Sequence, residues 1–246
     1  MAMNLSGEWA IVTGAGRRIG RVIALALAER GADIVVHCHR SREEAETTAA
    51  QVRKLGRRAL IFAADQSDWS AVECACDEAW RATGGIAVLV NNAAIYRRTP
   101  LKEIRERDWD ELLDTDLKGP FAFARFLGPL MKARGRGKII SIADAGAERV
   151  WPGYIPYCVA KAGVVAMTHG LAKALAPQVQ VNAIAAGTIL WPEDFDEKSK
   201  KRALRDVPLR RVGSPADIAR AVCFLVESGD YVTGAVLPVD GGRTVN

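Results

Sequence analysis

The sequence predicts an α/β fold in which helices cover both faces of a parallel sheet, and three observations support this prediction. Short β-branched runs alternate with longer amphipathic stretches along the chain, as in strand–helix–strand units. The 246 residues are 49% hydrophobic, which is enough to bury one large core. Neither a linker, a repeat nor a break in composition divides residues 1–246. We therefore expect a single doubly wound domain.

Seven short apolar runs are predicted to be buried strands, because both faces of such a sheet are covered. They occupy residues 8–13, 33–38, 59–64, 86–91, 138–143, 179–185 and 235–240. The amphipathic stretches between them are predicted to be helices near residues 19–30, 42–55, 68–82, 108–133, 157–175 and 215–227. Residues 187–215 form a polar, proline-containing insertion before the last helix, and such loops commonly cover ligands. We expect a substrate lid there.

Charge and composition exclude several classes of function. The net charge is +5, but 34 basic residues are interleaved with 29 acidic ones, so we expect no nucleic-acid binding. The first seven residues hold no long apolar stretch, which predicts a cytoplasmic protein without membrane contact. Five cysteines lack CxxC spacing, and His37 and His39 beside Cys38 have no further ligands nearby. Neither disulfides nor a metal site is expected.

The segment TGAGRRIG, residues 13–20, lies where the first strand passes into the first helix. Gly14, Gly16 and Gly20 allow the backbone to approach a ligand closely, and the helix N-terminus offers free N–H groups to a pyrophosphate. This context predicts a dinucleotide site.

Five motifs in order resemble the short-chain dehydrogenase/reductase family. They are TGAGRRIG, NNAA (91–94), YCVAK (157–161), VNAIAAG (181–187) and VDGG (239–242). The resemblance implies a Rossmann fold with seven parallel strands, hydride transfer to or from a nicotinamide dinucleotide, and a homotetramer or dimer. The cofactor residues it implies are Gly14, Gly16, Arg17, Arg18, Ile19, Gly20, His39, Arg40, Ser41, Asp65, Asn92, Ala93, Tyr157, Lys161, Gly187 and Ile189.

The end of the second strand indicates which dinucleotide is used. Members that bind NAD usually carry a carboxylate there for the ribose 2′-hydroxyl, whereas this chain has His39, Arg40 and Ser41, with Arg17 in the glycine turn. Guanidinium and hydroxyl donors suit a 2′-phosphate, which a carboxylate would repel. NADPH is therefore the predicted cofactor.

Tyr157 and Lys161 are the predicted catalytic pair. They lie four residues apart, so their side chains share one face of a helix. A phenol is a poor acid or base near neutral pH, and we expect the lysine ammonium to lower the tyrosine pKa by stabilising the phenolate. In the family, this lysine also binds the nicotinamide ribose.

Two further catalytic positions depart from the family pattern. The family's serine, thirteen residues before the tyrosine, falls on Asp144, and its asparagine falls on Asp116. An ionised carboxylate cannot donate a hydrogen bond to a carbonyl, so Asp144 favours a substrate with a ring nitrogen unless it stays protonated. Pteridine reductases are similar here, with aspartate at the position of Asp144. Asp116 is assigned to a water relay, although pteridine reductases generally keep the asparagine.

The predicted substrate residues are Arg18, Tyr96, Asp144, Tyr157 and Trp191. Arg18 replaces a family glycine, as in pteridine reductases, where this arginine reaches the phosphates and the pterin. Tyr96 corresponds to the aromatic residue that stacks on the pterin, and Trp151 is as good a candidate for the pocket as Trp191. Ala186 replaces the proline of the family's PG motif.

These residues predict an NADPH-dependent reductase of a pteridine C=N bond, on a dihydropterin or dihydrofolate-like molecule, with Tyr157 as proton donor. One alternative is a carbonyl reductase acting on 3-oxoacyl thioesters, with Asp144 protonated. Another is a dinucleotide-binding regulator without turnover, and a nucleic-acid module is the weakest alternative.

Overall fold

The computed structural model describes residues 3–191 and 196–245 and contains a seven-stranded parallel sheet. The strands run in the spatial order β3-β2-β1-β4-β5-β6-β7, so the order reverses between β1 and β4. Ligands of such sheets bind beyond the carboxyl ends of the strands at this reversal. The strands are β1 (Trp9–Val12), β2 (Asp33–Cys38), β3 (Ala59–Ala63), β4 (Val88–Asn91), β5 (Gly137–Asp144), β6 (Val179–Ala186) and β7 (Val236–Val239).

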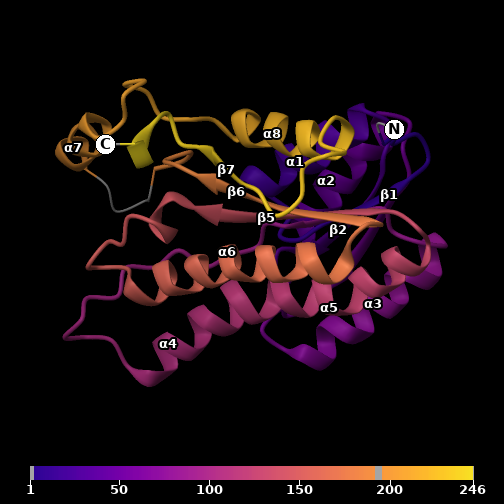
Figure 1. The fold of residues 1–246 in the computed structure, drawn as a ribbon, viewed down its shortest axis with the longest axis horizontal. Helices are drawn as coiled ribbons and strands as arrows, with labels where there is room; N and C mark the ends of the chain where they lie inside the picture. Colours follow the sequence, from indigo (N-terminus) through magenta and orange to yellow (C-terminus); the bar gives the residue numbers. More distant parts are fainter. Residues whose placement is uncertain (1–2, 192–195, 246) are drawn as a thin grey trace.

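Helices cover both faces of the sheet (Figure 1). One core joins the sheet to α1 (Arg18–Glu29), α2 (Arg42–Lys54) and α8 (Pro215–Glu227). The other joins it to α3 (Trp69–Thr83), α5 (Gly119–Ala133) and α6 (Ile155–Leu175). Side chains of β1 alternate between the two cores, with Ala10 and Val12 in the first and Trp9 and Ile11 in the second. The predicted Rossmann architecture is confirmed.

The predicted helix over residues 108–133 is wrong in one respect, because it is not continuous. It consists of α4 (Glu106–Leu113), a five-residue π-helix (Asp114–Lys118) and α5. A π-helix adds a residue to the turn, and here it carries Asp116 into the interior.

The predicted lid also differs from an irregular loop. Within it, α7 (Glu197–Arg205) begins at the side-chain cap of Asp196, whose carboxylate accepts from the Ser199 N–H. None of its residues is buried, and it lies with the C-terminal segment beyond the carboxyl ends of β5 and β6 (Figure 1). Residues 192–195 of the predicted lid lie outside the described residues. Within the described ranges, no helix is both long and apolar enough to cross a membrane.

Candidate active site

The glycine turn between β1 and α1 is packed against the segment that follows β4. Gly14 has a φ of +63°, and a Cβ there would lie 3.0 Å from the Cα of Ala93. A Cβ on Gly20 would lie 2.3 Å from the carbonyl oxygen of Gly14. The hydroxyl oxygen of Thr13 accepts hydrogen bonds from the N–H groups of Asn92 and Ala93, each at 2.9 Å. The predicted residues of both segments therefore meet at the reversal of strand order.

The N-terminus of α1 has no side-chain cap. Arg17 is the N-cap and provides no side-chain cap to the helix, so the first N–H groups lack that partner. Arg18 has a φ of +52°, a left-handed conformation that explains why the family has glycine there. The side chains of Arg17 and Arg18 are exposed, and Ile19 is half-buried in the first turn.

The end of β2 lies beside this turn. The N–H of Ala15 donates to the carbonyl oxygen of His37 at 3.0 Å, and a Cβ on Gly16 would lie 3.3 Å from the carbonyl oxygen of Ser41. His39 and Arg40 are exposed next to it. Asp65 lies 3.6 Å from the Nε2 of His39. The structure thus brings both predicted basic segments to one edge.

Two residues that the sequence analysis missed support the turn. Arg21 donates from Nη2 to the carbonyl oxygen of Gly16 at 2.7 Å and from Nε to the hydroxyl of Thr48 at 3.0 Å. Thr48 is fully buried and donates to the same Gly16 carbonyl oxygen. These bonds tie the glycine turn to α2, and no motif or periodicity in the sequence indicated them.

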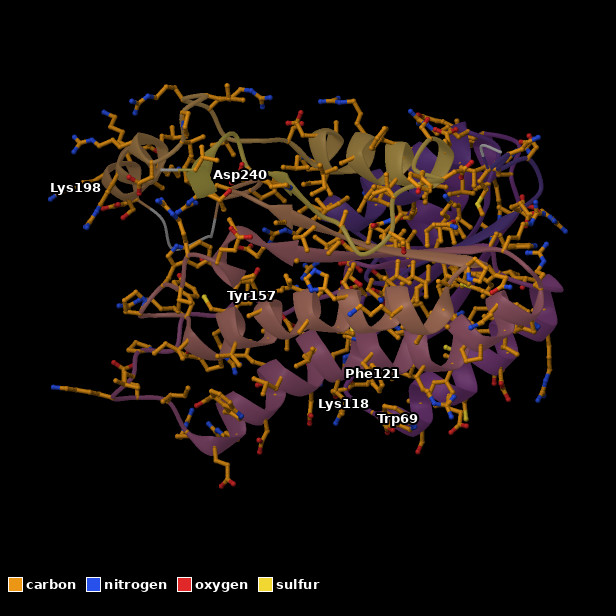
Figure 2. All side chains as sticks on the ribbon, in the orientation of Figure 1. Trp69, Lys118, Phe121, Tyr157, Lys198 and Asp240 are labelled. Atoms are coloured by element: carbon orange, nitrogen blue, oxygen red, sulfur yellow. The ribbon has the colours of Figure 1, made fainter. Side chains whose placement is uncertain are left out.

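Tyr157 and Asp144 form a hydrogen-bonded pair. Asp144 is the last residue of β5, and its Oδ1 accepts from the N–H of Gly146 at 2.7 Å. The phenol of Tyr157, near the start of α6 (Figure 2), donates to the other oxygen of Asp144 at 2.8 Å. Tyr157 is only 5% exposed, whereas Asp144 is partly exposed. Tyr157 and Asp144, two of the four predicted catalytic residues, are therefore in direct contact.

Lys161 and Asp116 lie close to this pair. The Nζ of Lys161 donates to the carbonyl oxygen of Ile142 at 3.1 Å and lies 3.9 Å from Oδ2 of Asp116. The Oδ1 of Asp116 accepts from the N–H of Ile95 at 2.8 Å. The same ammonium lies 5.6 Å from the centre of the Tyr157 ring. All four predicted catalytic residues are thus in one cluster, in which Tyr157, Lys161 and Asp116 are buried and Asp144 is partly exposed.

The expected lowering of the tyrosine pKa is wrong for this structure. The pKa of Tyr157 is raised well above 10, first by burial and then by the charges of Asp144 and Asp116. Burial also raises the pKa of Asp144, although the Gly146 N–H and the Tyr157 hydroxyl oppose it. Burial raises the pKa of Asp116 to about 6 against the opposing charge of Lys161. The expectation failed because burial, the largest cause, and the two carboxylates together disfavour the phenolate.

Aromatic side chains border the catalytic pair. The Tyr96 ring meets the Tyr157 ring edge-on at 5.0 Å and stacks on Tyr154 at 4.7 Å. Tyr96 remains 44% exposed, so part of its ring is available to a ligand. Trp151 contacts Tyr154 edge-on at 6.1 Å, and the guanidinium of Arg243 lies 5.2 Å from the Trp151 ring. The sequence analysis missed Tyr154 and Arg243.

Trp151 and Trp191 are the two tryptophans predicted to line the substrate pocket. An atom of the Trp151 ring would lie 2.8 Å from a Cβ on Gly146, which places this ring on the turn that holds Asp144. Trp191 is half-buried at the end of the described range 3–191. Its predicted contact with substrate stays a prediction.

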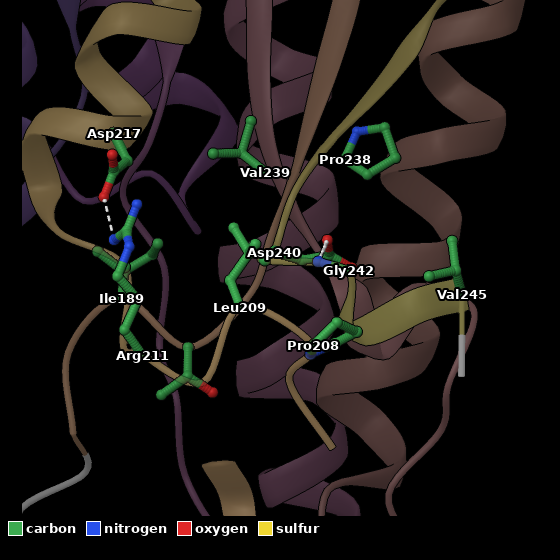
Figure 3. Close-up of a pocket in the computed structure, with 13 residues that line it drawn as sticks. Ile189, Pro208, Leu209, Arg211, Asp217, Pro238, Val239, Asp240, Gly242 and Val245 are labelled. Carbon is green, nitrogen blue, oxygen red and sulfur yellow. Dashed lines mark hydrogen bonds and ion pairs between the residues drawn. The ribbon is translucent and has the colours of Figure 1, made fainter. Parts of the chain in front are cut away.

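The chain after β6 borders a cavity of about 430 Å³ (Figure 3). Ile189 lines it, as do Asp240 and Arg211, and Arg211 pairs with Asp217 at 3.2 Å. A Cβ on Gly187 would lie 2.6 Å from the Cα of Asp240, so a side chain cannot be accommodated there without a backbone shift. This contact fixes the path by which the chain leaves β6 toward the cavity.

Comparison with known proteins places these features in a family. A family model described as enoyl-(acyl carrier protein) reductase matches residues 14–244. The 3-oxoacyl-[acyl-carrier-protein] reductase FabG of Staphylococcus aureus is 36% identical over 237 residues, covering 95% of this chain and 96% of the relative.

Two solved structures superpose on nearly the whole of this chain. A short-chain alcohol dehydrogenase of Sinorhizobium meliloti 1021, described as putative, superposes with a TM-score of 0.94 at 36% identity, covering 99% of this chain and 98% of that one. A gluconate 5-dehydrogenase of Burkholderia cenocepacia J2315, in complex with NADP and tartrate, gives a TM-score of 0.93 at 35% identity, with coverage of 99% and 97%.

Proposed function

The chain belongs to the short-chain dehydrogenase/reductase family, and from this premise we propose that it is an NADPH-dependent reductase of a carbonyl group, with 3-oxoacyl thioesters as the first substrate class. The single observation that carries the proposal is the partly buried hydrogen bond of 2.8 Å between Tyr157 and Asp144. Members of the family use a nicotinamide dinucleotide, and for this chain we propose NADPH rather than NADH.

The residues around the glycine turn fit NADPH. The uncapped N-terminus of α1 suits the pyrophosphate, and the exposed side chains of Arg17 and Arg40 suit the 2′-phosphate. When bound, the reduced nicotinamide supplies the hydride that reduces the substrate carbon.

Tyr157 delivers the proton that completes the reduction. Its phenol loses a proton to the substrate oxygen, so that an O–H bond forms as the Tyr157 O–H bond breaks. A protonated Asp144 then returns a proton to the phenolate oxygen across their hydrogen bond. Burial raises the pKa of Asp144, which favours the protonated form that this step requires. A protonated Asp144 can also donate to a carbonyl, as the family's serine does.

The names of several relatives support a carbonyl substrate. The matching FabG proteins are named for reduction of 3-oxoacyl groups on a carrier protein, and a structural neighbour is named for gluconate oxidation. Both names describe interconversion of a carbonyl and an alcohol.

A second candidate is reduction of a C=N bond in a planar heterocycle such as a dihydropterin or dihydrofolate. Two observations favour it: the half-exposed Tyr96 ring beside Tyr157, and the carboxyl group of Asp144 in place of a serine. An aromatic face stabilises a stacked ring by about 1 kcal/mol, and a carboxyl group suits proton transfer to a ring nitrogen.

A substrate panel distinguishes these candidates. The purified protein is assayed by NADPH oxidation with acetoacetyl thioester, dihydrobiopterin and dihydrofolate, and Tyr157→Phe is the control for Tyr157-dependent turnover. Preference for the thioester supports the first proposal, and preference for a pterin or folate supports the second. Tight NADPH binding without turnover on any of the three contradicts both and favours a dinucleotide-binding regulator.

A further inference from the structure

Asp116 is a fully buried carboxylate with an incomplete set of hydrogen bonds. The N–H of Ile95 satisfies its Oδ1 at 2.8 Å, whereas Oδ2 has no hydrogen-bond partner among the described residues. The Nζ of Lys161 lies 3.9 Å from this oxygen, and both side chains are at most 5% exposed. Because a buried carboxylate is unfavourable without a countercharge, the ammonium of Lys161 is its electrostatic partner.

The π-helix between α4 and α5 gives Asp116 this position. Its neighbours Asp114 and Lys118 pair with each other at 2.8 Å, and each is about two-fifths exposed. Asp116 instead points into the interior, where the π-helix packs against α6. π-helical turns often occur at functional sites, and this one separates one carboxylate from the surface charges beside it.

The titratable groups around Asp116 include Lys161, whose Nζ lies 3.9 Å away, and the phenol of Tyr157, both on α6. The ammonium of Lys161 also acts on Asp144 at the end of β5, and so does the guanidinium of Arg243. Lys161 therefore faces two carboxylates. Where the family pattern has a neutral serine and a neutral asparagine, the ammonium acts on the phenol alone. Here its charge is shared, and Asp144 and Asp116 both disfavour a phenolate at Tyr157.

Resting on the proposed reductase function, we propose that Asp116 is a positioning residue that offsets the charge of Lys161 and thereby keeps the Tyr157 and Asp144 pair loaded with its proton. The pair then serves as an acid over a wide pH range. Oxidation of an alcohol is the reverse step and needs a phenolate to accept the hydroxyl proton, so it requires alkaline pH. Asp116 thus adapts the site to reduction.

The test that needs no substrate is an absorbance titration of tyrosine ionisation at alkaline pH. The chain has four tyrosines, and Tyr157→Phe in each background identifies the Tyr157 contribution by subtraction. Asp116→Asn keeps the shape and the acceptor for Ile95 but removes the charge. We expect it to lower the pH of Tyr157 ionisation by about one unit or more. Asp114→Asn, on the exposed side of the same π-helix, is the matched control and should leave it unchanged.

Equal Tyr157 titrations in the wild-type chain and in Asp116→Asn overturn the proposal. If Asp116→Asn does not fold, Asp116→Ser is titrated in its place against the same criterion. With the alcohol that corresponds to an accepted carbonyl substrate, such as 3-hydroxybutyryl thioester for acetoacetyl thioester, the pH at which oxidation by NADP⁺ begins should fall in Asp116→Asn by the same interval, while Asp114→Asn keeps the wild-type profile. A chain that turns over no panel substrate contradicts the proposed function, yet the absorbance titration still decides the role of Asp116.

Discussion

The stability of Asp116→Asn relative to the wild-type chain is expected to rise between acid and neutral pH. The native carboxyl has a pKa of about 6, raised by burial from the ordinary value of 3.8. It therefore binds its proton more tightly in the native state than in the unfolded state. Its favourable contribution to stability is fully present below pH 3.8 and is lost as the pH rises through about 6. Asparagine resembles the protonated acid at every pH.

The magnitude follows from the shift of about two pKa units. At 1.36 kcal/mol per unit, ionising the buried carboxyl costs about 3 kcal/mol once the native group is fully ionised. The linkage relation gives a cost of about 1 kcal/mol near pH 4.5 and about 3 kcal/mol near pH 7.5. The advantage of Asp116→Asn should therefore grow by about 2 kcal/mol over this range, or roughly 4 to 8 °C in Tm for a chain of this length.

Thermal unfolding of both proteins near these two pH values measures the effect. Asp114→Asn is the control, because its carboxylate lies in the same π-helix with a side chain that is 42% exposed. Its Tm difference from the wild-type chain should change little with pH. A Tm difference for Asp116→Asn that is equal at both pH values would show that Asp116 does not titrate as a buried, weakly compensated acid.

Three further predictions test other parts of the site. Arg40→Asp should reduce the preference for NADPH over NADH by about tenfold or more, because it replaces a charged donor with a repelling carboxylate; unchanged KM values for both cofactors contradict the assigned phosphate site. Tyr96→Ala should weaken binding of dihydrofolate by roughly fivefold while acetoacetyl thioester is little affected, and equal losses argue against stacking. Gly20→Ala should destabilise the fold by about 1 to 3 kcal/mol, since its methyl group would lie 2.3 Å from the Gly14 carbonyl oxygen; an unchanged urea midpoint excludes the steric conflict.

Much of the fold could be predicted because burial leaves a pattern in the sequence. All seven strands were expected, and their apolar runs coincide with the observed β1 to β7. The helix α7 was missed since it has no buried residue and therefore no apolar period to detect. The π-helix over Asp114–Lys118 was missed because one extra residue in a turn shifts the helical pattern too little to stand out from its flanks.

The site could be predicted where residues occur in fixed motifs. Tyr157, Lys161, Asp144 and Asp116 meet as expected, because motif order follows the carboxyl ends of adjacent strands. The sequence could not reveal how burial and charge together set the pKa values of these residues, because both depend on distances in the folded chain. For the same reason the aromatic border was only partly predicted: Tyr154 contributes to it through a contact with Tyr96 that crosses 58 residue positions.

Asp144 and Asp116 act together on the charge of the site. The carboxylate of Asp144 accepts from Tyr157 and is stabilised by the charges of Lys161 and Arg243. Asp116 brings a second carboxylate to the same ammonium of Lys161, and closely spaced carboxylates favour the binding of a proton. Asp116→Asn or Asp144→Ser should therefore change the Tyr157 pKa more in the wild-type chain than in a chain whose other aspartate has already been replaced. Additive effects in the double variant Asp116→Asn, Asp144→Ser would mean that the two carboxylates titrate independently.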